Sequence, residues 1–240
     1  MKEPVRRPWI HGWLACETAA NLCLMWLITA GPTREYLDSV RFLSNGSSGR
    51  MGYAIALEAA RRGHEVRLIS GPVALPCPDG VVRVQVDSAE EMLAAGREIL
   101  AAEGCEVLLG VAAVSDSRPR RRFPGKPAKE DMPATIDLVP NPDVLAALTA
   151  LGRARVSVGF ALESMAEETG GFEAALLRAR SKLERKGLQA IILNALTAME
   201  QERAQCWWIE SQGVADSLGS GDKAALAVEI VARLEMRLRA

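Results

Sequence analysis

The chain has 240 residues, of which 49% are hydrophobic and 25% are charged, and its formal net charge is -1. This composition is typical of a soluble globular protein with one or two domains. The near-zero net charge excludes a general basic field for nucleic acid, so we expect no nucleic-acid partner. Residues 9–29 are fairly apolar but contain His11, Glu17 and Asn21. We therefore expect neither a membrane span nor a membrane partner.

Cysteine and histidine usage limits the chemistry that the chain can carry. The five cysteines include no C-x-x-C pair, which favours reduced thiols in a cytoplasmic protein over a disulfide framework or a zinc site. His11 and His64 are the only histidines, so a catalytic histidine paired with serine or cysteine is not expected. Any metal would be a hard cation on oxygen ligands, and the sequence leaves those ligands unknown.

Strand and helix patterns alternate along the chain, which predicts a parallel sheet with helices on both faces. In chain order, the patterns predict a strand at 26–29, a helix at 50–62, a strand at 66–70, a helix from 88 to about 102, strands at 107–111 and 135–139, a helix after Asn141, a strand at 156–160, a helix at 172–186, strands at 190–193 and 206–209, and a terminal helix at about 222–238. Between them, residues 115–134 form a long basic loop without helical or strand period. Neither an internal repeat nor a clear linker interrupts the order, so we predict a single α/β domain.

The start of this domain is placed at Met25, which directly precedes the first strand as a start residue would. We interpret residues 1–24 as an upstream extension that is disordered or loosely docked. Residues 25–240 then make up the domain.

The segment after the first strand is the strongest functional signal. Residues 28–52 read ITAGPTREYLDSVRFLSNGSSGRMG, in which an apolar strand runs into a basic, polar loop that ends where a helix pattern begins. Backbone N–H groups at such a helix N-terminus bind anions, so we predict a phosphate cradle at Ser47, Ser48 and Gly49. The alternative is a flexible surface linker, because the segment is neither a Walker A loop nor a strict G-x-G-x-x-G.

Charged residues elsewhere also allow two interpretations. Asp116 follows a buried strand, at the edge where open α/β sheets bind ligands, but a solvated loop carboxylate is equally compatible with the pattern. Lys126 and Lys129 lie in the basic loop and could neutralise a polyphosphate as part of a lid, or be solvated charges.

Helix ends account for the other candidates in a purely structural way. Asn141, Pro142 and Asp143 have the composition of a helix start. Lys182 and Lys186 lie near a helix C-terminus, where they would interact favourably with the helix dipole.

Taken in chain order, several segments resemble phosphopantothenate–cysteine ligase, the synthetase half of the bacterial bifunctional flavoprotein of coenzyme A biosynthesis. They read ITAGPTRE, VRFLSNGSSGRMG, GVAAVSD, NPD, GFALE and SKLERKG, and the resemblance runs from about Met25 to the C-terminus. The resemblance implies a Rossmann-like, mostly parallel sheet in a cytoplasmic domain that forms a homodimer. The flavin-dependent decarboxylase half is not matched, so no flavin is expected.

The resemblance implies a two-step reaction with CTP and Mg²⁺. The carboxylate of 4′-phosphopantothenate attacks the α-phosphate of CTP, which gives an acyl-cytidylate and pyrophosphate. The amine of cysteine then displaces CMP and forms an amide. Binding both partners together supplies proximity, and cations offset the charge that gathers at the phosphates.

Roles for individual residues follow from the resemblance by position. Asn45 would hold the acyl intermediate, with Arg41 shortly before it in the chain and Ala113 beside the intermediate. Lys126 would serve the second half-reaction, in a loop that departs from the family pattern K-x-K-K by reading Lys126-Pro127-Ala128-Lys129. The implied nucleotide contacts are Gly110, Val111, Ala112, Asp116, Lys126, Asn141, Pro142, Asp143, Val144, Phe160, Lys182 and Lys186.

Two other functions are weighed against the ligase. One is a nicotinamide-dependent oxidoreductase on a Rossmann sheet, whose short-chain version needs Tyr-x-x-x-Lys. That version is excluded, because Tyr36 and Tyr53 are followed at this spacing by Val40 and Leu57. The other is a non-catalytic nucleotide- or phosphate-binding relative that has kept the cradle. Binding of CTP with Mg²⁺, without binding of NADPH, would favour the ligase.

Overall fold

A computed structural model describes residues 24–195 and 203–239 of the chain. The extension interpreted from residues 1–24 falls outside the described residues, apart from Leu24. The division of the chain at Met25 therefore stays a prediction.

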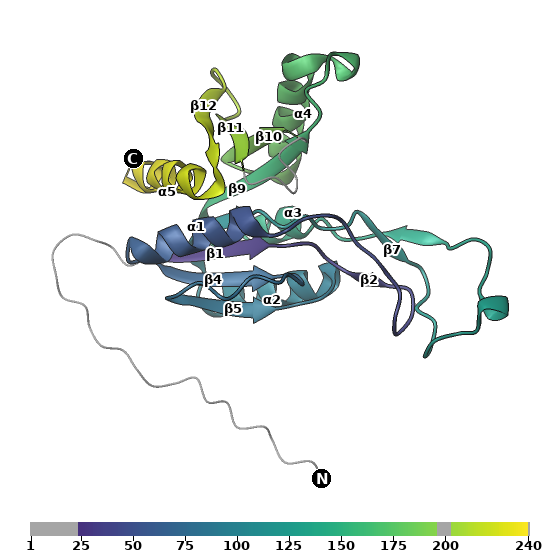
Figure 1. The fold of residues 1–240 in the computed structure, drawn as a ribbon. Helices are drawn as coiled ribbons and strands as arrows, with labels where there is room; N and C mark the ends of the chain where they lie inside the picture. The colour runs from purple at the N-terminus through teal and green to yellow at the C-terminus, as the bar shows by residue number, and fades with distance from the viewer. Residues whose placement is uncertain (1–23, 196–202, 240) are drawn as a thin grey trace, which may run out of the picture.

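The central layer of the molecule is a mostly parallel sheet (Figure 1). Within the described residues it has eight strands, in the spatial order β12-β11-β10-β9-β6-β1-β4-β5. In chain order these strands are β1 (Met25–Ala30), β4 (Glu65–Ser70), β5 (Val81–Gln85), β6 (Cys105–Gly110), β9 (Ala154–Glu163), β10 (Ala190–Ala195), β11 (Arg203–Ile209) and β12 (Asp216–Asp222). The six strands from β5 to β10 are parallel, and β11 and β12 pair antiparallel at one edge. The predicted fold class is confirmed.

Helices cover both faces of this sheet. In the described ranges the α-helices are α1 (Arg50–Arg61), α2 (Ala89–Ala102), α3 (Val144–Thr149), α4 (Gly171–Lys186) and α5 (Lys223–Arg239), and a 3-10 turn, η2 (Glu167–Thr169), precedes α4. α1 and α5 pack on one face, whereas α2, α3 and α4 pack on the other. In β1, Trp26 and Ile28 join the α1 and α5 cluster, while Leu27 joins the α2 and α3 cluster. Strands buried on both faces read as continuous apolar runs, which is why their sequence pattern was clear.

Two strands of the sheet were not predicted. β5, with the sequence VVRVQ, is an edge strand whose residues are only partly buried or exposed, so its apolar signal is short. β12 reads DSLGSGD, and glycine, serine and aspartate are poor strand formers. Its pairing with β11 places it in the sheet. By contrast, the terminal helix buries Leu226, Ile230 and Leu234, as their spacing predicts.

A narrow extension, here called the arm, projects away from the sheet (Figure 1). It consists of residues 35–43 and 117–140, and it contains β2 (Glu35–Tyr36), β3 (Phe42–Leu43), β7 (Ser117–Pro119), the 3-10 turn η1 (Lys129–Asp131) and β8 (Leu138–Pro140). The two chain segments are joined by backbone hydrogen bonds from Ser39 N–H to Gly125 O (3.0 Å) and from Phe123 N–H to Leu37 O (2.8 Å).

The arm corrects two predictions. The basic loop at 115–134 does contain a strand, β7, which is too short to show a period. The strand predicted at 135–139 begins only at Leu138, and it pairs with β7 instead of joining the main sheet. Both elements exist because they pair with each other, a long-range contact that local spacing does not reveal.

Candidate functional site

The candidate site lies at the carboxyl ends of β1 and β6. These neighbours mark the point where the strand order reverses, because the chain continues from β1 towards β5 on one side and from β6 towards β10 on the other. Open α/β sheets bind ligands in the crevice at such a point. The loops that follow β1 and β6, at residues 31–49 and 111–116, carry half of the predicted site residues.

Direct hydrogen bonds hold these two loops together. Ala113 N–H donates to Gly31 O (2.9 Å), and Ser115 N–H donates to the Thr33 hydroxyl (3.0 Å). The Asn45 side chain completes the junction, because its Nδ2 donates to Ala113 O at 2.7 Å. The loops therefore face each other, with the half-buried Asn45 between them.

Asn45 also organises the cradle. Its Oδ1 accepts the backbone N–H of Ser47 at 3.0 Å, which fixes the cradle relative to the loop after β6. A carboxamide has two N–H donors and two lone pairs on its oxygen. Asn45 therefore keeps one N–H and one lone pair for a ligand while both of its polar atoms are already anchored.

The start of α1 is open towards the same space. Gly49, which precedes the helix, has φ 73°, a left-handed conformation that favours glycine, and a Cβ there would lie 2.9 Å from Val73 Cγ1. Gly52 brings α1 close to β1, because a Cβ on it would meet Ala30 Cβ at 2.5 Å. Among the described residues, no side chain caps this helix. Its first N–H groups and the positive end of its dipole therefore remain available to an anion.

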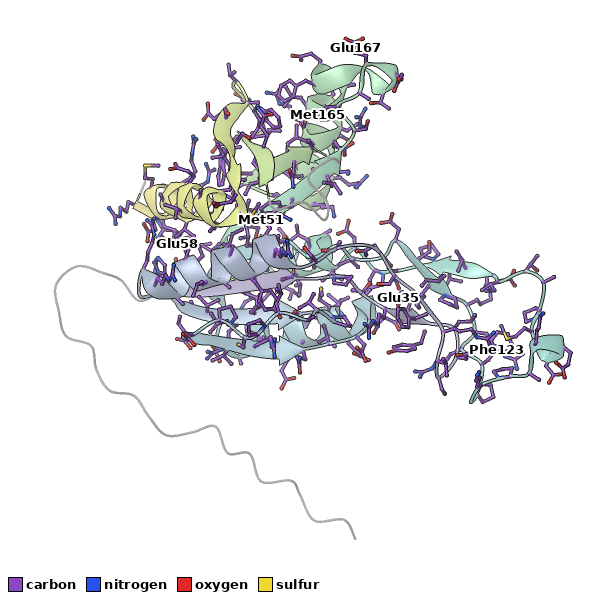
Figure 2. The ribbon with its side chains drawn as sticks, viewed as in Figure 1. Glu35, Met51, Glu58, Phe123, Met165 and Glu167 are labelled. Carbon is purple, nitrogen blue, oxygen red and sulfur yellow. The ribbon has the colours of Figure 1, made fainter. Side chains whose placement is uncertain are left out.

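A cavity of about 460 Å³, here called the cradle cavity, opens at this junction. The sequence-predicted residues that line it are Asn45, Ser47, Ser48, Gly49, Val111, Ala112, Ala113, Asp116, Phe160 and Lys182. Met51, in the first turn of α1, lines it as well, and Figure 2 shows where this residue lies on the helix.

A smaller hollow of about 190 Å³, the adjoining pocket, continues from the cradle cavity. Its sequence-predicted lining residues are Gly110, Ala112, Asp116, Asn141, Pro142, Asp143, Val144, Phe160 and Lys186. Ala112, Asp116 and Phe160 line both spaces. The two form one elongated site along the carboxyl ends of the strands.

Residues of the adjoining pocket also have the structural roles that their sequence pattern predicts. Asp143 caps α3 by accepting the N–H of Ala146 (3.1 Å), and the same oxygen pairs with Lys186 Nζ (2.9 Å). Asn141 Nδ2 donates to Ser115 O (2.8 Å). Asp116 differs, because within the described ranges its exposed carboxylate has neither a hydrogen bond nor an ion pair.

Lys182 is held at the wall of the cradle cavity by a buried carboxylate. Glu163 Oε1 pairs with Lys182 Nζ at 2.7 Å, and its Oε2 pairs with Arg178 Nε, also at 2.7 Å. Burial alone would raise the pKa of Glu163, but the hydrogen bonds and positive charges of Lys182 and Arg178 outweigh it and hold the pKa below its usual value. Glu163 is therefore ionised at neutral pH and fixes the Lys182 ammonium.

Sequence reasoning did not select Arg50, Asn194 and Lys223 as site residues, although all three line the cradle cavity. Lys223 is the first residue of α5 and directly follows β12. Because β12 was not recognised, no pattern pointed to the residue after it. The polar termination of β10 at Asn194 was the available signal for that residue, at a strand end on the ligand-binding edge.

Two predicted catalytic residues line neither space. Arg41 lies in the arm, where its Nε donates to Asp38 Oδ2 at 2.6 Å. The backbone N–H of Arg41, helped by its guanidinium, lowers the pKa of buried Asp38 to about 2. Lys126 is exposed in the arm. It follows Phe123 in the chain, and Figure 2 shows Phe123 in the arm, away from the sheet. The roles of Arg41 and Lys126 stay predictions.

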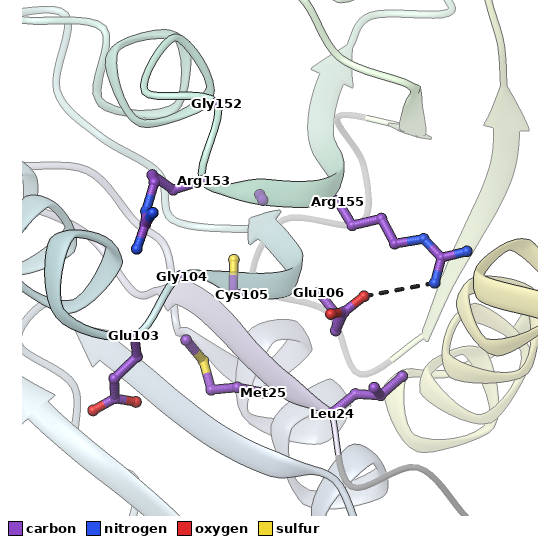
Figure 3. A pocket seen from close by; sticks show the side chains of 10 residues that line it. Leu24, Met25, Glu103, Gly104, Cys105, Glu106, Gly152, Arg153 and Arg155 are labelled. Atoms are coloured by element: carbon purple, nitrogen blue, oxygen red, sulfur yellow. Dashed lines mark ion pairs between the residues drawn. The ribbon is translucent and has the colours of Figure 1, made fainter.

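A separate hollow of about 480 Å³ lies at the opposite, amino-terminal edge of the sheet (Figure 3). Met25, Cys105 and Ala154, at the beginnings of three parallel strands, contribute to its wall. Burial raises the pKa of the Cys105 thiol to about 12, so this thiol is not a nucleophile at neutral pH. None of the predicted site residues lines this hollow.

Two absences concern the described part of the chain. It contains no group of three or more His, Cys, Asp or Glu side chains that could hold a metal ion. Its helices are also too short or too polar for any of them to cross a membrane.

The family model for the C-terminal domain of DNA/pantothenate metabolism flavoproteins matches residues 24–238. The chain is similar to the coenzyme A biosynthesis bifunctional protein CoaBC of Vibrio vulnificus, with 38% identity over 218 residues that make up 87% of this chain and 51% of the relative. For the same protein of Escherichia coli, the identity is 44% over 179 residues, 73% of this chain and 42% of the relative.

These curated relatives are longer proteins, and the chain spans about half of their length. Among solved structures, the crystal structure of the C-terminal domain of CoaBC matches with a TM-score of 0.73 and 36% identity, covering 90% of this chain and 95% of that domain. The match therefore extends over nearly all of that domain.

Proposed function

Because the chain belongs to the family of DNA/pantothenate metabolism flavoprotein C-terminal domains, we propose that it is a CTP-dependent ligase that joins 4′-phosphopantothenate to cysteine. Relatives named for coenzyme A biosynthesis support this proposal. The observation that carries it is the elongated site, in which Asn45 is hydrogen-bonded to Ala113 at the junction of the cradle cavity and the loop after β6.

The adjoining pocket is the space for the nucleotide base. Thr29 O accepts the N–H of Val111 (3.1 Å), and the Thr29 hydroxyl accepts that of Ala112 (3.4 Å). These N–H groups are thus occupied, so the carbonyl oxygens of this strand end are the groups that read the base. Carbonyl oxygens accept a hydrogen bond from the exocyclic amino group of cytosine, and they repel the carbonyl oxygen that uracil has instead.

The cradle cavity is the space for the phosphates and the reacting carboxylate. The uncapped N–H groups at the start of α1 and the ammonium of Lys182 surround it with positive potential. The acyl phosphate forms between the carboxylate of phosphopantothenate and the α-phosphate of CTP. The remaining N–H of Asn45 is an additional hydrogen-bond donor to it. Holding the carboxylate beside the α-phosphate supplies the proximity that the first step needs.

Mg²⁺ fits the oxygen donors where the cradle cavity meets the adjoining pocket. The Asp116 carboxylate lines both of them, and in the described ranges it is not engaged by another residue. Mg²⁺ is commonly held by one or two carboxylates together with substrate phosphates, so a preformed cluster of ligands is not required. When bound, the ion neutralises charge at the phosphates.

A homodimer is part of the proposal. The arm exposes apolar side chains, with Val40 at 56%, Phe42 at 41% and Leu138 at 49% exposure, and such side chains favour a partner surface. Lys126 lies on the same arm, away from the cavities of its own chain. Association of two copies would give this lysine a second cavity to reach. The free thiols of the described cysteines agree with a cytoplasmic location.

A pyrophosphate assay tests the function. With 4′-phosphopantothenate, cysteine, CTP and Mg²⁺, we expect pyrophosphate release and a new amide product detectable by mass spectrometry. A non-catalytic relative would bind CTP in a calorimeter without releasing pyrophosphate. An oxidoreductase would bind NADPH, which the ligase is expected not to do. Either of these two outcomes would refute the proposal.

A further inference from the structure

The two lysines of the cradle cavity are held in different ways. Lys182 shares the buried carboxylate of Glu163 with Arg178, so its charge is partly compensated within the protein. Lys223 lines the same cavity and is half-buried at the start of α5. Within the described ranges, no carboxylate forms an ion pair or a hydrogen bond with it. The positive charge of Lys223 is therefore uncompensated.

The surroundings of Lys223 oppose its charge. Burial lowers its pKa, and the positive charge of Arg50 lowers it further. The first residue of a helix is also an unfavourable place for a cation, because the helix dipole is positive there. The adjacent carboxylate of Asp222 accepts the N–H of Ala225 at 2.7 Å and thereby caps α5. These surroundings make the Lys223 ammonium unfavourable unless an anion binds beside it.

The location of Lys223 indicates what it binds. It lines the cradle cavity together with Ser47 and Ser48, but it is not part of the adjoining pocket. It is therefore placed near the predicted phosphate cradle, away from the proposed base site. A bound phosphate would supply the negative charge that the protein itself does not provide, in a partly desolvated space where such pairs are strong.

We infer that Lys223 is a phosphate-binding residue whose ammonium donates to phosphate oxygens of an anionic substrate in the cradle cavity. This inference rests on the proposed function. Two substrates of that reaction carry the required chemistry, the polyphosphate of CTP and the 4′-phosphate of phosphopantothenate. Cysteine carries no phosphate and serves as the internal reference.

Kinetics of Lys223→Met and Lys223→Arg test this role. For Lys223→Met, we expect the KM of CTP or of phosphopantothenate to rise about ten- to a hundredfold, the usual cost of losing a hydrogen bond to a charged group. The substrate whose KM rises identifies the phosphate. Lys223→Arg should restore most of the affinity, and the KM of cysteine should stay within twofold. The matched control is Arg239→Met, which removes a cation from the exposed end of the same helix.

Several results would overturn the inference. One is unchanged KM values for both phosphate-bearing substrates, and another is an equal rise in the KM of cysteine. Removing a cation from a helix N-terminus should not lower the thermal stability, so a clear drop in Tm for Lys223→Met would also contradict the inference. If the wild type releases no pyrophosphate at all, the proposed function fails. Calorimetry with CTP, with 4′-phosphopantothenate and with inorganic pyrophosphate then tests Lys223 separately, and equal affinities of wild type and Lys223→Met for all three would overturn its role.

Discussion

Replacing Asn45 by aspartate removes the donor that holds the two loops together. In the wild type, Nδ2 of Asn45 lies 2.7 Å from Ala113 O. In Asn45→Asp, a carboxylate oxygen would face that carbonyl oxygen, and leaving this partly buried acceptor unsatisfied costs about 1–3 kcal/mol. At about 2–4 °C per kcal/mol for a chain of this size, Tm should fall by about 2–12 °C.

The same substitution should impair catalysis more than stability. A carboxylate about 4 Å from the acyl phosphate repels it by about 4 kcal/mol at an effective dielectric constant of 20, which corresponds to a loss of about a thousandfold in kcat/KM. Asn45→Ala removes the amide without adding charge and is the matched control. The assay compares kcat/KM from pyrophosphate release for both variants. If Asn45→Asp retained near-normal kcat/KM, or were no worse than Asn45→Ala, the reasoning would be refuted.

Three further predictions concern the base, the arm and Glu163. Because carbonyl oxygens remain to read the base, kcat/KM for UTP should be at least about a hundredfold below that for CTP; equal values would contradict this reading. Lys126→Gln should release pyrophosphate but accumulate the acyl-cytidylate, measured by mass spectrometry, and normal amide formation would transfer the role to Lys129. Because the pKa of Glu163 is lowered in the folded state, its stabilising effect is present above the unfolded pKa of about 4.3 and is lost as the pH falls through the folded value. Thermal unfolding of the wild type should therefore lose more Tm between pH 5 and pH 3 than that of Glu163→Gln, and parallel curves would disprove this.

Features encoded within one segment could be predicted from the sequence. The loop that carries Ser47 and Ser48 was recognisable because a strand, a polar loop and a helix start follow one another directly, and both residues line the cradle cavity. That they bind a phosphate stays a prediction. The buried strands were recognisable because both faces are covered, which leaves an uninterrupted apolar run. Asp143 was interpreted correctly as a possible helix cap, since capping depends only on neighbouring residues.

Features that depend on contacts between distant segments could not be predicted from the local sequence. β12 is a strand because it pairs with β11. Lys223, the residue that follows β12, could therefore not be identified as a site residue from the sequence. The arm is held by backbone bonds such as that from Phe123 to Leu37, and nothing in a basic, proline-rich loop indicates where it points. For this reason, the sequence could not predict where Lys126 lies relative to the two cavities.

The first half-reaction is the most direct test of the central claim, that one continuous site brings CTP and phosphopantothenate together. Enzyme mixed with CTP, Mg²⁺ and 4′-phosphopantothenate in the absence of cysteine should release pyrophosphate in an amount close to that of the enzyme, and then stop. Release that does not require phosphopantothenate, or no release from an enzyme that binds CTP, would contradict the account.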